Sequence, residues 1–377
     1  MATKYARAAG GTWATDSTWS TTDGGGADTV APVDGDDVIF SNQSGSVTVS
    51  ATAPVSGGLL SLTFNGGTGY TGTITVNAAL IVRGNVTLSS SMSSAGSSIL
   101  IVNATANLTS NTHQWGAGLS LRTATMTLQD AWVLPSKPLA TASSTATVNG
   151  FSITAAGLTI GANLQGSTTV TLSGGTWSAT AGTMENSLTI AGDVTVSGTV
   201  AFANDTLTYS SGTVTTTGST LSLGDSVTLN TAGISWNNVT CTSTSVTNNS
   251  LLTILGTLTL PNAAITFSGT NGFTTATLAN TTLTGNRTTT LTQTNTYTVT
   301  TSITAAGNGA NHLTLASSHG TNRVPFVFSG GTPPSLNLVR ATRLDSSGGT
   351  VIYTNDTITD SLNWAAPVTG GSMWIFS

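Results

Sequence analysis

The sequence carries very little charge for its length. Of 377 residues only 9 are Lys or Arg and 14 are Asp or Glu, with one Glu (Glu185) and two Lys (Lys4 and Lys137). Long charged side chains are good helix formers, so their scarcity favours an all-β chain. The net charge of -5 comes without a basic cluster, and we therefore expect no nucleic-acid partner.

Cysteine and long apolar runs are also scarce. The single cysteine, Cys241, cannot form an internal disulfide, and its place after Val239 and Thr240 predicts an inward strand position. No apolar stretch approaches membrane-spanning length, so we expect no membrane insertion. The start of the chain contains Lys4 and Arg7 but no apolar core, and no secretory signal is predicted.

Threonine and glycine are abundant instead. The chain has 78 Thr and 43 Gly. Thr is β-branched and suits a pleated surface that is half exposed. Chains rich in Ser, Thr and Gly are often disordered, but the regular apolar pattern described next argues against disorder here.

One unit recurs between about residues 158 and 267: an apolar residue, a small residue, an apolar residue and a turn. This alternation is typical of a strand with one buried and one wet face. Units begin roughly 6 to 8 residues apart, which is too close for ordinary hairpins and favours a solenoid coil of about 20 residues with three short strands. Examples are Leu158–Ile160, Val170–Leu172, Leu188–Ile190, Val194–Val196, Leu207–Tyr209, Leu221–Leu223, Val227–Leu229 and Leu258–Leu260.

We predict an all-β, single-stranded, right-handed parallel β-helix with caps at both ends. The expected parts are an N-terminal cap and attachment segment (1–54), the helix itself (55–310) and a C-terminal β cap (311–377). The segment 130–138 contains a Trp and two prolines. It is interpreted as a loop leaving one coil, because the same pattern resumes at Val148.

Aromatic residues and a proline mark the two ends. A solenoid end exposes unpaired strand edge and bare core, so it needs a cover. Trp13, Trp19 and Pro32 are candidates at the N-terminal end, and Trp364 and Trp374 at the C-terminal end. The same residues would also serve an interface with a neighbouring subunit.

Three aspartates lie close together after Pro32. Asp34, Asp36 and Asp37 have the chemistry of calcium ligands. Aspartates in a turn before a strand more often accept hydrogen bonds from nearby backbone N–H groups, and this is the favoured interpretation. We predict no cofactor.

Both ends resemble a family of β-solenoid proteins known mostly as virion structural proteins of tailed bacteriophages and as related bacterial repeat proteins. The opening likeness lies in Gly11-Thr12-Trp13, Thr18-Trp19-Ser20, Asp28-Thr29-Val30-Ala31-Pro32 and Gly35-Asp36-Asp37-Val38-Ile39-Phe40. The closing likeness lies in 334–338, 356–361 and Trp374, with different spacing. The resemblance implies a phage particle protein, made in the host cytoplasm, with no catalytic residues to carry over. It also implies a homotrimer, the common state of phage β-helices.

Polysaccharide lyases and hydrolases also use solenoids, so the residues for catalysis matter. Such enzymes need clustered carboxylates on one wall. Asp205 and Asp225 lie one coil length apart and form the only candidate acid pair, although each more often caps a turn. His113, His312 and His319 share no spacing with acids or with Cys241, so no metal or nucleophile site is predicted.

The sequence therefore predicts a non-enzymatic structural protein on the outside of a virion, as a tail fibre, spike or capsid decoration. Its expected partners are further copies of itself, capsid or tail proteins, and a host-surface glycan if it serves adhesion. The alternatives are a tailspike-like polysaccharide-degrading enzyme and a bacterial surface adhesin. Ice binding is a further alternative, because Thr73-Ile74-Thr75 and Thr257-Leu258-Thr259 present local Thr-x-Thr pairs.

Overall fold

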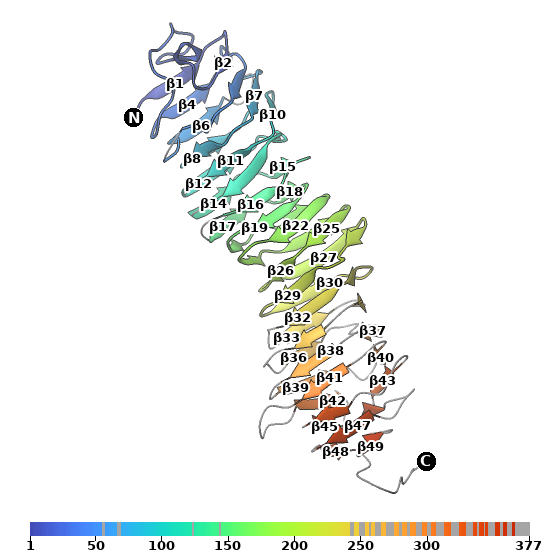
Figure 1. The fold of residues 1–377 in the computed structure, drawn as a ribbon. Helices are drawn as coiled ribbons and strands as arrows, with labels where there is room; N and C mark the ends of the chain where they lie inside the picture. The colour runs from blue at the N-terminus through green and yellow to red at the C-terminus, as the bar shows by residue number, and fades with distance from the viewer. Residues whose placement is uncertain are drawn as a thin grey trace. The chain divides into compact units, whose positions relative to one another are not determined.

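In the computed structural model, short strands stack in parallel coils and form a β-solenoid (Figure 1). The structure describes residues 1–241 except 55–56, 66–68, 123 and 143–144. Beyond residue 241 it describes the backbone of the strands and of Leu255, with side-chain burial at Val246, Ile254 and Leu255. The predicted parallel solenoid is confirmed.

The chain divides into two compact units. The first comprises Met1–Thr195 and Ser210–Thr213, and the second comprises Val196–Tyr209 and Val214–Ser377. Strand pairing continues across both positions at which the sequence suggested a division. Val47 is aligned with Ile74, and Ala306 with Asn337.

The strands of the first unit belong to four sheets, which are grouped into three walls. The second wall joins two of the sheets, one ending at Ala95 and one beginning at Trp132, with Gln114 between them. The first wall consists of β1 (Thr3–Ala6), β4 (Asp37–Phe40), β6 (Ser61–Phe64), β9 (Val86–Thr87), β12 (Ala106–Thr109), β14 (Ala124–Leu128), β17 (Ala146–Gly150), β20 (Leu164–Gly166) and β23 (Thr183–Glu185). The second consists of β2 (Gly11–Thr12), β5 (Val47–Val49), β7 (Thr73–Val76) and β10 (Ser93–Ala95), then β15 (Trp132–Leu134), β18 (Ile153–Ala155), β21 (Val170–Leu172) and β24 (Leu188–Ala191). The third consists of β8 (Leu80–Val82), β11 (Ile99–Val102), β13 (Gly118–Leu121), β16 (Leu139–Thr141), β19 (Leu158–Ile160) and β22 (Gly175–Ala179).

The coils vary in length. The aligned residues Asp37 and Ser61 are separated by 24 positions, whereas the aligned residues Thr147 and Gln165 are separated by 18. The extra residues enter the turns, because the strands themselves stay three to five residues long in most coils. The expectation of about 20 residues per coil therefore holds as an average.

Side chains alternate between the core and the surface as the apolar–small–apolar pattern predicts. In β21, Val170 and Leu172 are buried and Thr171 is half-buried on the outside. The outward Thr171 is aligned with Thr154 on one side and Thr189 on the other. The core is thus a column of Val, Leu and Ile, and the walls present short neutral side chains.

Glycine is needed where neighbouring coils turn close together. Gly175 follows the Ser173-Gly174 turn and has φ +77°, in the left-handed region. A Cβ added there would lie 1.8 Å from the carbonyl oxygen of Ala156. No other residue type fits this corner without displacing the backbone.

The segment 130–138 differs from the loop expected from its sequence. Trp132–Leu134 forms β15, which pairs in parallel with β18, and Trp132 is fully buried. Pro135 follows the strand and ends it instead of preventing it. The two prolines therefore mark only the corner that leads into β16.

The second unit is also a stack of parallel strands. Its described side chains bury Trp236, Val239 and Cys241, so the predicted inward position of Cys241 is confirmed. The strands that begin this region are β25 (Val194–Ser197), β26 (Thr199–Phe202), β27 (Thr206–Ser211), β28 (Val214–Thr215), β29 (Thr220–Leu223), β30 (Val227–Asn230), β31 (Ser235–Trp236), β32 (Asn238–Cys241), β33 (Ser245–Asn248) and β34 (Thr253–Ile254).

Parallel pairing continues into the segment expected to form the C-terminal cap. Leu313 is aligned with Val339 and Val351 with Trp364. The remaining strands are β35 (Leu258–Leu260), β36 (Ile265–Ser268), β37 (Thr275–Leu278), β38 (Thr281–Thr284), β39 (Arg287–Leu291), β40 (Thr296–Val299), β41 (Ile303–Ala306), β42 (Leu313–Ser317), β43 (Val324–Phe328), β44 (Ser335–Asn337), β45 (Val339–Thr342), β46 (Leu344–Asp345), β47 (Val351–Thr354), β48 (Thr357–Thr359) and β49 (Trp364–Ala365).

Candidate functional site

The N-terminal end of the first unit is built differently from the coils that follow. β1 pairs in parallel with β4 but antiparallel with β3 (Trp19–Ser20), which follows a short 3-10 turn, η1 (Asp16–Thr18). The antiparallel pair aligns Tyr5 with Ser20 and Ala6 with Trp19. The chain thereby folds back over the first coil and covers its end.

Aromatic rings fill the core beneath this cover. The centroids of Trp13 and Trp19 lie 4.8 Å apart, and those of Trp19 and Phe40 lie 5.9 Å apart, both edge to face. Phe40 stacks on Phe64 at 4.5 Å. Tyr70 packs against both phenylalanines, and burial raises the pKa of its hydroxyl. The two N-terminal tryptophans named from the sequence therefore lie together at the end of the core.

Two basic side chains fix the loop that follows β3. Lys4 is almost fully buried, forms an ion pair with Asp28 and donates a hydrogen bond to the carbonyl oxygen of Val30 at 3.0 Å. The pKa of Asp28 is lowered, first by the hydrogen bond from Lys4 and then by the N–H of Thr29. Arg7 donates to the carbonyl oxygens of Gly25 and Ser17 at 3.2 and 2.8 Å. The loop is thus tied to β1 at several points.

The three aspartates weighed above as possible calcium ligands accept hydrogen bonds from different groups. Asp36 accepts hydrogen bonds from the N–H groups of Ala2 and Val33 at 2.7 and 3.1 Å. Asp34 accepts one from the N–H of Gly58 at 3.2 Å, and Asp37 accepts one from the hydroxyl of Ser61. Backbone bonding, the favoured interpretation for this cluster, is what Asp34 and Asp36 show. Across the described residues no three acids, histidines or cysteines gather into a metal site.

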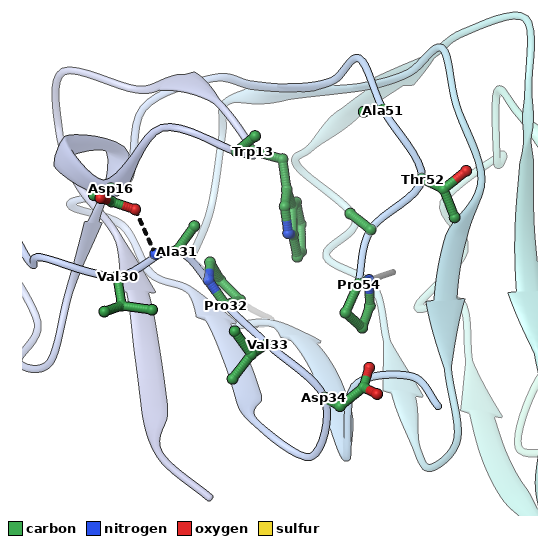
Figure 2. Close-up of a pocket in the computed structure, with 12 residues that line it drawn as sticks. Trp13, Asp16, Val30, Ala31, Pro32, Val33, Asp34, Ala51, Thr52 and Pro54 are labelled. Atoms are coloured by element: carbon green, nitrogen blue, oxygen red, sulfur yellow. Dashed lines mark hydrogen bonds between the residues drawn. The ribbon is translucent and has the colours of Figure 1, made fainter. Parts of the chain in front are cut away.

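A pocket of about 460 Å³ opens beside the buried tryptophans (Figure 2). Figure 2 shows the indole ring of Trp13 between Pro32 on one side and Pro54 on the other. The lining comes from three stretches of chain, residues 13–16, 30–34 and 51–54, and most of it is apolar. The lining residues are Trp13, Ala14, Asp16, Val30, Ala31, Pro32, Val33, Asp34, Ala51, Thr52, Ala53 and Pro54.

The pocket is apolar in its walls and negative in its charge. Asp16 and Asp34 contribute carboxylates to the lining, and no Lys, Arg or His is among the lining residues. Val30 and Val33 are about half exposed, at 48 % and 50 %. Trp13 is only 2 % exposed, so the face of its ring is not presented to solvent. The site offers apolar contact and negative charge, with few hydrogen-bonding groups.

Hydrogen bonds hold the pocket in shape. Asp16 accepts a bond from the N–H of Ala31 at 2.9 Å, and Asp36 accepts one from Val33. The hydrogen bond from Lys4 to the carbonyl oxygen of Val30 fixes the same segment of the chain. Because the lining segment is already ordered, a ligand would lose little affinity to ordering it.

The acid pair proposed from the sequence lies in two turns of the second unit. The N–H of Asn204 donates to the carbonyl oxygen of Asp225 at 2.7 Å, and the N–H of Thr228 donates to that of Asp205 at 3.0 Å. Asp225 therefore lies beside Asn204 in the neighbouring coil. The carboxylate of Asp205 accepts a bond from the N–H of Thr206 at 2.7 Å, which is the turn-capping role favoured from the sequence.

The other residues singled out from the sequence do not form a site in the part of the chain that is described. His113 contacts the hydroxyl of Ser94 at 2.7 Å, and burial lowers the pKa of its imidazole. His312, His319 and Trp374 lie outside the described residues, as does Thr257. Trp364 is described as the backbone of β49 only.

The Thr-x-Thr pair in β7 does not continue into a regular ladder. Thr73 and Thr75 are aligned with Ser93 and Ala95 in the next coil, and Thr75 with Thr48 in the previous one. Nothing in these described coils matches the flat repeating array that the ice-binding hypothesis requires. In the second wall, the aligned residues Thr154, Thr171 and Thr189 form a single column.

Sequence reasoning identified Trp13 and Pro32 but missed most of the pocket. Pro54 and Val33 carry no motif, and only the pairing of successive coils brings them to one place. The search for membrane-crossing helices finds none among the described residues. Comparison with known protein families, with curated proteins and with solved structures finds no match to this chain.

Proposed function

We propose that this chain is a non-enzymatic structural component of a bacteriophage particle, displayed on the virion surface as a tail fibre, spike or capsid decoration. The observation that carries the proposal is the wall chemistry of the solenoid. Described coils present mainly Thr, Ser and other short neutral side chains outside an apolar core. Such a stack is held together by its apolar core and needs no reactive site, and solenoids of this kind occur in tail fibres and tailspikes.

The N-terminal end of the chain supports the same proposal. The N-terminal segment that resembles phage solenoid proteins forms the folded-back cover described above. Its exposed apolar residues, Val30 and Val33, lie beside an ordered pocket, as expected for a surface that contacts another protein. We assign attachment to this end and exposure to the rest of the stack.

The rival enzymatic function has less support among the described residues. A retaining or inverting glycosidase needs two carboxylates that face one substrate. Asp205 uses its carboxylate in a turn, and Asp225 is aligned beside Asn204. A tailspike-like enzyme would show itself by releasing oligosaccharides from bacterial polysaccharide, with loss of release in Asp205→Asn.

The proposed assembly is a homotrimer. Neutral walls with so few charges offer little repulsion between copies. Light scattering of the purified protein tests this part, because a trimer has three times the chain mass of 37.7 kDa. A stable monomer would remove the trimer from the proposal and leave the structural role in place.

The location of the protein tests the function itself. Antibodies raised against the purified chain are expected to label the outside of particles of a phage whose genome encodes it. Immunogold electron microscopy of intact and of disrupted particles is the measurement. Labelling at capsid or tail identifies the position. Absence of the chain from purified particles, by labelling and by mass spectrometry, would overturn the proposal.

A further inference from the structure

We propose that the N-terminal pocket binds a polypeptide segment in which an apolar side chain is flanked by Lys or Arg. In the particle, this segment belongs to the neighbouring protein to which the solenoid attaches. This identification of the partner rests on the proposed function, whereas the inferred chemistry of the ligand does not.

The shape of the pocket sets the kind of ligand. Its volume of about 460 Å³ is within the usual range for sites that enclose a small ligand or a few side chains. Val30 and Val33 are the half-exposed apolar side chains of the lining, and the buried Trp13, Pro32 and Pro54 lie behind them. An aliphatic or aromatic side chain placed here would be partly removed from water by contact with Val30 and Val33.

The charge of the lining decides what lies next to that side chain. In Figure 2, Asp16 lies beside Ala31 and Asp34 lies below the Trp13 ring. Asp34 accepts a hydrogen bond from Gly58, and the guanidinium of Arg83 lies beside the neighbouring Gly35, so the charge argument rests on Asp16. The lining contains no cationic residue. The two cations of the N-terminal segment, Lys4 and Arg7, are engaged in holding the loop. Complementarity with Asp16 therefore favours a ligand with positive charge next to its apolar group.

A glycan fits these observations poorly. Sugar recognition uses an exposed aromatic face together with many hydrogen-bonding groups, but Trp13 is 2 % exposed and only Asp16, Asp34 and Thr52 bring polar side chains to the lining. A nucleic acid or an anionic lipid would be repelled by the carboxylates. A basic, apolar polypeptide is the one class that suits both the walls and the charge.

The surrounding loop explains how the pocket keeps this specificity. Hydrogen bonds from Lys4 to Val30, from Ala31 to Asp16 and from Val33 to Asp36 fix residues 30–33 of the lining at three points. Asp16 thus has a double role, since one carboxylate oxygen orders the loop and the group also supplies charge. Asp16→Asn keeps an oxygen that can accept the bond from Ala31 and removes the charge, so it separates the two roles.

The test is selection from a synthetic random heptapeptide library on beads, using the purified full chain. The wild-type protein is expected to select peptides that place Lys or Arg next to Leu, Ile or an aromatic residue. Val33→Arg puts bulk and positive charge into the pocket, and we expect it to bind the selected peptides about tenfold more weakly, as for a lost interface anchor. Asp16→Asn should keep the apolar preference and lose the basic one.

Phe151→Arg is the matched control. Phe151 is also an exposed apolar side chain, at 57 %, but it lies outside the pocket lining. This variant should select the same peptides as the wild type. Selection of acidic or uncharged peptides, no selection at all, or equal binding by Val33→Arg would each overturn the assignment of the pocket.

A second experiment separates failure of the pocket assignment from failure of the proposed function. The same variants are expressed during phage assembly, and their retention on purified particles is measured. Loss of retention in Val33→Arg but not in Phe151→Arg supports docking through the pocket. If particles retain Val33→Arg normally, the pocket is not the attachment site although the structural function stands. If the chain is absent from particles while peptide selection succeeds, the pocket assignment stands and the proposed function fails.

Discussion

Replacing Ile190 by Asp is expected to destroy the folded structure around β24. Ile190 is fully buried in the strand Leu188–Ala191, in a core of aliphatic side chains. An unpaired carboxylate at this depth would lose its hydration and gain no partner. We expect a destabilisation of about 4 kcal/mol or more, which is comparable to the total stability of many domains.

The matched control is Thr195→Asp. Thr195 lies a few residues further along, in β25, and its side chain is exposed. The same new residue on the outer wall should change stability by no more than about 0.5 kcal/mol. Thermal unfolding followed by circular dichroism, together with the yield of soluble protein, gives the comparison. Equal effects of the two substitutions would show that the inside and outside of the wall are wrongly assigned.

Replacing Trp19 by Ala is expected to open the N-terminal end of the stack. Trp19 is fully buried, contacts Trp13 and Phe40 edge to face, and donates its indole N–H to the carbonyl oxygen of Trp13 at 2.7 Å. Truncation of a buried Trp usually costs about 3–5 kcal/mol. Here it also uncovers the strand edges of the first coil, so self-association should accompany the loss of stability.

Phe151→Ala serves as the control for this change. It also removes an aromatic ring, but from a side chain that is 57 % exposed in a turn between β17 and β18. We expect a change of less than about 0.5 kcal/mol and no self-association. Urea titration and light scattering measure both properties. If Trp19→Ala remains monodisperse with wild-type stability, Trp19 does not close the end of the core.

The architecture was predictable because its cause is local. In units such as Val170-Thr171-Leu172, two apolar residues alternate with one small polar residue, and that pattern is enough to set which side faces the core. The short distance between units then excludes hairpins and helices. Buried positions of Cys241, Trp177 and Trp236 follow from the same alternation.

Features that depend on register between coils could not be predicted from the sequence. Asp205 and Asp225 are separated by about one average coil, but aligned residues lie 18 positions apart at Thr147 and Gln165 and 24 apart at Asp37 and Ser61, so a spacing of one average coil does not imply alignment. The pocket likewise depends on which residues of two coils meet, and Pro54 and Val33 carry no signal of that meeting. The prolines of the segment 130–138 led to the prediction of a loop, but Trp132–Leu134 forms a strand that ends at Pro135.

Register is therefore the property to measure directly. Thr171 and Thr189 are aligned on neighbouring strands of the second wall, with both side chains on the outside. The double variant Thr171→Cys/Thr189→Cys is expected to form a disulfide on mild oxidation, because aligned Cα atoms of adjacent strands lie about 5 Å apart, within the bonding range. In Thr171→Cys/Ser187→Cys, a shift of two residues places the Cα atoms about 8 Å apart, too far for a disulfide. Peptide mapping by mass spectrometry should find the disulfide in the first variant only. A disulfide in neither variant, or equal amounts in both, would contradict the parallel stack of coils on which the walls, the closed end and the pocket depend.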